Sequence, residues 1–125
     1  MDITPLVPAG RQLIQTYGDM RFRIAGVVHE GSVLVLPDRT LPWTVTDITG
    51  ITYQSLNSLT IQDHAAEILL IGCGPRFVPE PAGLRKPLRD LGLVLEWMDT
   101  GAACRTFNVL LAEERPAAAA LVAVE

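Results

Sequence analysis

The fold class of this 125-residue chain is decided by the stretch Ile68-Leu69-Leu70-Ile71-Gly72-Cys73-Gly74-Pro75. This is an unbroken apolar run that ends in a glycine turn. A second run, Leu93-Val94-Leu95, ends in the polar corner formed by residues 96–100. Continuous rather than alternating apolar runs are typical of strands buried on both faces, as in a parallel sheet covered by helices. Both runs are therefore predicted to be inner strands of an α/β domain.

A short helix is expected between these two strands. Leu84, Leu88 and Leu91 recur at positions i, i+4 and i+7, which places them on one helical face. Pro87 is tolerated only in the first turn, so the helix should begin close to Leu84. Gly92 is a suitable residue to end it.

A second helix and a last strand are expected after the polar corner. Thr100 is predicted to be the N-cap of this helix, with Asp99 beside its positive end. The helix should stop at residues 113–116, because Pro116 prevents its simple continuation. Residues 117–124 are rich in alanine, which favours helix, but they end in Leu-Val-Ala-Val, and we interpret them as a strand that returns to the sheet.

The size of the chain favours one domain with a substantial core. We expect an irregular N-terminal arm over residues 1–20, punctuated by prolines and glycines, and a single α/β domain over residues 21–125. The expected architecture has three layers. A mixed central β-sheet is flanked by helices, with an additional N-terminal β-hairpin.

That hairpin is predicted from two extended segments. Residues 21–24 alternate between polar and apolar, residues 29–31 form a plausible turn, and residues 32–36 are apolar. Gly26 is interpreted as a possible bulge or close backbone approach. The segment 56–66 is equally compatible with a short helix and with an extended conformation.

Composition excludes several classes of function. The net charge is −4 with a pI near 5.1, and the arginines are scattered, so a nucleic-acid-binding face is not expected. No apolar run approaches the roughly 18 residues of a membrane-spanning helix, and no signal peptide is recognised, so a cytoplasmic location is predicted. Cys73, Cys104, His29 and His64 lack metal-ligand spacing, so we expect two reduced, half-buried thiols, no metal and no cofactor.

Two groups of residues could carry chemistry. The Gly72-Cys73-Gly74 turn lies where a phosphate loop would begin, but the third glycine of that motif is replaced by Phe77, which favours a simple tight turn. Near the end of the second strand, four polar side chains could line a ligand pocket: Glu96, Asp99, Arg105 and Asn108. We favour the alternative that Glu96 pairs with Arg105 or with the helix N-terminus in a structural role. The chain shows no GxSxG elbow and no base assigned to Cys73, so no catalytic residue is predicted.

Three segments together resemble a known family: Ile68 to Pro75, Gly92 to Thr100, and the Arg105-Thr106-Phe107-Asn108 motif with its neighbours. They are similar to the small α/β family of unknown function that includes the mitochondrial respiratory complex I assembly factor 3 and uncharacterised bacterial members. The resemblance covers roughly residues 22–122. It implies the three-layer fold with its β-hairpin, no established enzymatic activity, and action through protein contacts.

Three hypotheses about function follow. The first is a non-catalytic bacterial protein that binds partner proteins, with a link to assembly of a respiratory or membrane complex. The second is a small-molecule binding protein or enzyme. The third is a homo-oligomer whose exposed apolar patch meets itself. The candidate partner or ligand pocket comprises nine residues: Gly72, Cys73, Gly74, Glu96, Met98, Asp99, Thr100, Arg105 and Asn108.

Overall fold

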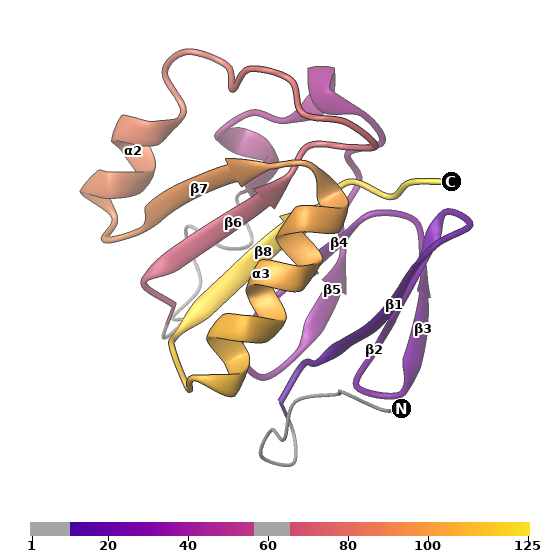
Figure 1. The fold of residues 1–125 in the computed structure, drawn as a ribbon. Coiled ribbons are helices and arrows are strands. Elements are labelled where there is room, and N and C mark those ends of the chain that lie inside the picture. The colour runs from indigo at the N-terminus through magenta and orange to yellow at the C-terminus, as the bar shows by residue number, and fades with distance from the viewer. Residues whose placement is uncertain (1–10, 57–65) are drawn as a thin grey trace.

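The computed structural model describes residues 11–56 and 66–125 and contains two β-sheets (Figure 1). A three-stranded sheet has the order β1-β2-β3, and a five-stranded sheet has the order β5-β4-β8-β6-β7. The strands are β1 Ile14–Gly18, β2 Arg21–Ile24, β3 Val27–Glu30, β4 Val33–Val35, β5 Thr40–Pro42, β6 Ile68–Gly72, β7 Val94–Met98 and β8 Ala117–Leu121. The helices are α2 Arg85–Asp90 and α3 Thr100–Ala112, with 3₁₀ turns η1 Ile48–Gly50 and η2 Gln54–Leu56.

The elements form three layers, which confirms the expected fold class. The large sheet is mixed: β6 pairs in parallel with β7 and β8, whereas β4 pairs antiparallel with β5 and β8. Figure 1 shows α3 lying over one face of this sheet. One apolar core joins that face to α3 and to the small sheet. A second core joins the other face to α2 and to segment 43–56.

The two central parallel strands are buried on both faces. In β6, Leu69 and Ile71 belong to the core on the α2 side, and Leu70 belongs to the core on the α3 side. All five residues of β8 are buried, four of them alanines. Small side chains let α3 pack close to this strand, so burial overrides the helix preference of alanine. The predictions of an inner strand at Ile68 and of a returning C-terminal strand are both confirmed.

The prediction that residues 93–95 are buried on both faces is wrong. β7 is an edge strand, and its burial alternates: Leu95 is buried, whereas the Val94 side chain is 54% exposed. The reason is that α3 packs mainly on β6 and β8 and leaves β7 largely uncovered on its own side of the sheet. The strand nevertheless pairs in parallel with β6, so the α/β architecture holds.

The short helix between β6 and β7 lies where the leucine spacing placed it. Helix α2 spans Arg85–Asp90, with Leu84 and Leu88 buried and Pro87 in its first turn. Gly92 follows with φ +85°, a conformation that favours glycine.

The N-terminal hairpin is present, but its predicted turn was misplaced. β2 and β3 are joined by Ala25-Gly26, which both have positive φ, as two-residue hairpin turns require. Gly26 is thus part of the turn rather than a bulge. The segment 32–36 supplies β4 of the large sheet instead of the second hairpin strand. Residues 14–18, predicted as part of an irregular arm, form β1, because they pair with β2 and dock on α3.

Candidate functional site

Three of the predicted site residues form a buried junction at the carboxyl end of β6. The Thr100 hydroxyl donates to the Val122 carbonyl at 2.7 Å and accepts from the Gly74 amide at 3.1 Å. The Thr100 amide donates in return to the Gly74 carbonyl at 2.9 Å. A Cβ on Gly72 would lie 2.8 Å from the Thr100 Cα, so only glycine fits there. This junction ties β6, α3 and the C-terminal tail together.

Asp99, rather than Thr100, is the N-cap of α3. Its carboxylate accepts from the Ala102 amide at 2.8 Å. The predicted N-cap was wrong by one residue, because Thr100 is the first helical residue and its side chain turns into the core. Asp99 therefore satisfies a free amide and places its negative charge at the positive end of the helix.

Arg105 and Asn108 share a face of α3, as predicted, and that face receives β1. The Asn108 side chain accepts from the Ile14 amide at 2.9 Å and donates to the Ile14 carbonyl at 2.8 Å, so it acts as a substitute strand partner. The Arg105 guanidinium donates to the Tyr17 hydroxyl at 3.1 Å. These two side chains fasten the small sheet to α3.

Glu96 and Met98 lie on the exposed side of β7, away from Arg105. No ion pair joins Glu96 to Arg105 among the described residues, so the predicted structural pairing is wrong. The reason is that Glu96 faces an open groove beside β7, whereas Arg105 faces β1. The negative charge of Glu96 is the smallest of the causes that raise the pKa of Arg85, after the hydrogen bond and the charge of Glu80.

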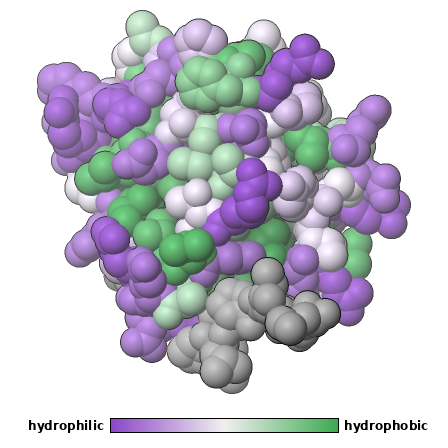
Figure 2. Space-filling view, in the orientation of Figure 1, coloured by the Kyte–Doolittle hydropathy of each residue, from purple (hydrophilic) through white to green (hydrophobic). Residues whose placement is uncertain are grey.

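We call this open depression the α3–β7 groove. Its volume is about 330 Å³, and most of its lining is aliphatic. Figure 2 shows hydrophobic side chains gathered on the left of this face, where Figure 1 places β7, β6 and α3. The groove is lined by Ile68, Leu70, Val94, Glu96, Met98, Thr106, Leu110 and Arg115.

Cys73 lines a different cavity, of about 390 Å³, at the carboxyl end of β6, which we call the Cys73 cavity. Segment 46–48 and the tail residues Val122 and Ala123 complete its wall. Cys73 is buried, and its thiol lies 3.5 Å from the Arg76 carbonyl. Cys104 is also free and buried, and burial raises the pKa of its thiol to about 12. Both thiols are thus more enclosed than the half-buried state predicted.

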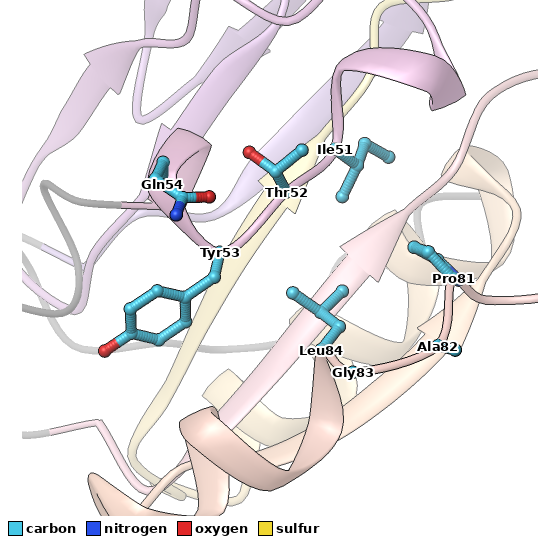
Figure 3. Close-up of a pocket in the computed structure, with 8 residues that line it drawn as sticks. All are labelled: Ile51, Thr52, Tyr53, Gln54, Pro81, Ala82, Gly83 and Leu84. Carbon is cyan, nitrogen blue, oxygen red and sulfur yellow. The ribbon is translucent and has the colours of Figure 1, made fainter.

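A third cavity, of about 320 Å³, lies between two loop segments (Figure 3). Segment 51–54 forms one wall, and segment 81–84, which leads into α2, forms the other. Figure 3 shows the Leu84 side chain pointing toward the first segment. No sequence motif singled out this region.

The nine predicted residues therefore lie at separate places. Gly72, Gly74 and Thr100 meet in the buried junction, and Cys73 lines its own cavity. Glu96 and Met98 line the α3–β7 groove. Asp99 caps α3, and Arg105 and Asn108 hold β1. Sequence reasoning missed Arg115 and Thr106 in the groove. The spacing of Thr106 and Leu110, i and i+4, is the signal that could have placed both on one flank of α3.

Among the described residues, no helix is both long and apolar enough to cross a lipid bilayer.

Comparison with known proteins places this chain among relatives of similar length and fold. The family model described as "Protein of unknown function (DUF498/DUF598)" matches residues 14–122. An uncharacterized protein of Rhodobacter capsulatus is 39% identical over 114 residues, which is 91% of this chain and 86% of the relative. A crystal structure described as an outer membrane protein from Bartonella henselae has 38% identity and a TM-score of 0.84, with 94% of this chain and 98% of that chain covered.

A further relative carries a functional name. The NADH dehydrogenase [ubiquinone] 1 alpha subcomplex assembly factor 3 of Xenopus tropicalis is 36% identical over 109 residues. The match covers 87% of this chain but only 60% of that protein.

Proposed function

Because this chain belongs to the DUF498/DUF598 family of proteins of unknown function, we propose that it is a non-catalytic protein that binds other proteins during assembly of a respiratory or membrane complex. The observation that carries the proposal is the 36% identity to complex I assembly factor 3 over 87% of the chain. This chain spans 60% of that relative, so the partners of the whole relative are themselves part of the proposal. A cytoplasmic site of action stays a prediction.

The positions of the polar side chains support a binding role over a catalytic one. Asp99 satisfies a helix amide, and Asn108 and Arg105 satisfy groups of β1. A catalytic acid or base needs a side chain that can reach a substrate. Here these three groups hold the fold together, and the apolar α3–β7 groove offers a surface that suits a protein partner better than a polar substrate.

The experiment is deletion of the gene in the source organism, followed by native electrophoresis of its respiratory complexes. We expect less assembled complex I and more of its subassemblies, both restored by the wild-type gene. Normal amounts of every assembled respiratory and membrane complex in the deletion strain would contradict the proposal.

The competing proposal is a small-molecule site, and the Cys73 cavity is the observation that favours it. At about 390 Å³ this cavity is large enough for a small ligand. A thermal-shift screen over metabolite classes tests this function, because a ligand at about 100 times its dissociation constant adds about 2.7 kcal/mol of stability. A shift that is abolished by Thr46→Trp, at an exposed position of the cavity wall, would support it, and a flat screen would exclude it.

A further inference from the structure

The face of β7 beside α3 is one of the surfaces where the fold leaves apolar side chains exposed. Val94 on β7 is 54% exposed, and Val109 on the outer flank of α3 is 55% exposed. The α3–β7 groove lies between the strand and the helix, with Ile68 and Leu110 only half-buried in it. Contiguous apolar surface of this kind usually marks an interaction site.

The outer edge of β7 has one backbone group that is already occupied. The Val94 amide and the Met98 carbonyl both bond toward β6. Successive residues of a strand direct their backbone N–H and C=O groups to opposite edges, so the backbone groups of Leu95 and Trp97 face away from β6. The Leu95 carbonyl already accepts from the Arg85 guanidinium at 2.7 Å. This bond leaves one fewer free group for the addition of another strand along this edge.

The groove carries one charge of each sign, Glu96 and Arg115. Among the described residues no ion pair includes Glu96 or Arg115. Ile68 on β6 is level with Val94 on β7 and with Ala117 on β8. Glu96 lies two residues beyond that level on β7. Arg115 lies on the other side of β6, in the turn between α3 and β8 that leads into Ala117.

This arrangement is self-complementary. Consider a two-fold axis that lies in the interface, perpendicular to the line from Glu96 to Arg115 and midway between them. It would set Glu96 of one copy against Arg115 of the other, and would do so twice. The aliphatic side chains would then meet at the centre with the charges at the rim, as in known interfaces. Two-fold dimers are also the commonest soluble oligomers. We propose that the α3–β7 groove binds a second copy of this chain in such a dimer. The proposal goes beyond the proposed function and does not depend on it.

The test is sedimentation velocity of the full-length chain over a range of concentrations, with charge-reversal variants. The wild type should form dimers. Glu96→Arg alone and Arg115→Glu alone should be monomeric, because each creates two like-charge contacts. An equimolar mixture of the two variants should recover the dimer as a heterodimer, since every contact is again between opposite charges. The double variant should also dimerise.

Matched controls lie on the small sheet, where Arg23 and Glu30 are exposed and far from the groove. Arg23→Glu and Glu30→Arg should leave dimerisation unchanged, and thermal melts should show that all variants are folded. A monomeric wild type would overturn the proposal. So would a dimer that the single reversals do not weaken, or single variants whose mixture stays monomeric. Normal complex assembly in the deletion strain would leave this result untouched, so the two proposals fail separately.

Discussion

Removal of the Thr100 hydroxyl should lower the free energy of unfolding strongly, although the side chain keeps nearly the same volume. Its hydroxyl is buried and serves two backbone groups, the Val122 carbonyl at 2.7 Å and the Gly74 amide at 3.1 Å. Thr100→Val keeps nearly the same volume but leaves both backbone groups buried without that partner. Each unsatisfied buried group costs about 1–3 kcal/mol, so for the two groups we expect a loss of about 2–6 kcal/mol.

Equilibrium urea unfolding measures this loss, and thermal unfolding gives an independent estimate. For a chain of this size, 1 kcal/mol corresponds to about 4 °C, so Thr100→Val should lower Tm by about 10 °C or more. Thr100→Ser is the matched control. It keeps the hydroxyl and removes one methyl group, which should cost about 1 kcal/mol. The reasoning fails if Thr100→Val is as stable as the wild type, or if the serine variant is the less stable of the two.

Three further predictions concern the same layer of the fold. Gly72→Ala should destabilise strongly in urea unfolding, because the added Cβ meets the Thr100 backbone at 2.8 Å, whereas Gly18→Ala, with open space around it, tests backbone strain alone. Asn108→Ala should lower the free energy of unfolding by about 1–3 kcal/mol. Hydrogen exchange at the Ile14 amide should become faster, because this amide loses the Asn108 side-chain oxygen as its acceptor. Unchanged exchange at that amide would refute the role of Asn108 in docking β1. Burial raises the pKa of the Cys104 thiol to about 12, so the folded state keeps a proton that the unfolded state releases above pH 9 or so. Stability should therefore fall between about pH 9 and 12, by up to about 1.4 kcal/mol per pH unit, and this slope should flatten in Cys104→Ala.

The sequence predicted those elements in which local and global signals agree. At β6, a continuous apolar run coincides with burial on both faces. At α2, leucine spacing, Pro87 in the first turn and Gly92 after the end all specify the same short helix. At β8, the alanines favour a helix. The strand was predicted because Pro116 prevents simple continuation of the preceding helix and because the alternation of strands and helices calls for a final strand. Agreement between levels, more than any single propensity, made these predictions reliable.

The wrong predictions have a common physical origin. The structural features they concern are determined by neighbours that are distant in the sequence. Residues 93–95 look like an inner strand, but α3 leaves its own side of β7 largely uncovered, so Val94 is exposed. Gly26 and Gly31 both have positive φ and both could have formed the hairpin turn. The choice between them was made by β4, which joins β8 in the large sheet rather than β2. Local sequence carries little information about either outcome.

The candidate site shows the same limit more sharply. Glu96, Asp99, Arg105 and Asn108 lie within a segment of 13 residues, yet their side chains do not converge on one site. The alternation of a strand sends Glu96 into the groove, while the turn of a helix sends Arg105 and Asn108 toward β1. The partner of Asn108 is 94 residues away along the chain, so no spacing within the segment could reveal it. Polar residues that cluster in sequence at a strand–helix corner thus predict a site only when the elements they face are also known. In this chain the strongest case for binding rests instead on Glu96 and Arg115, which lie 19 residues apart in the sequence and line one groove.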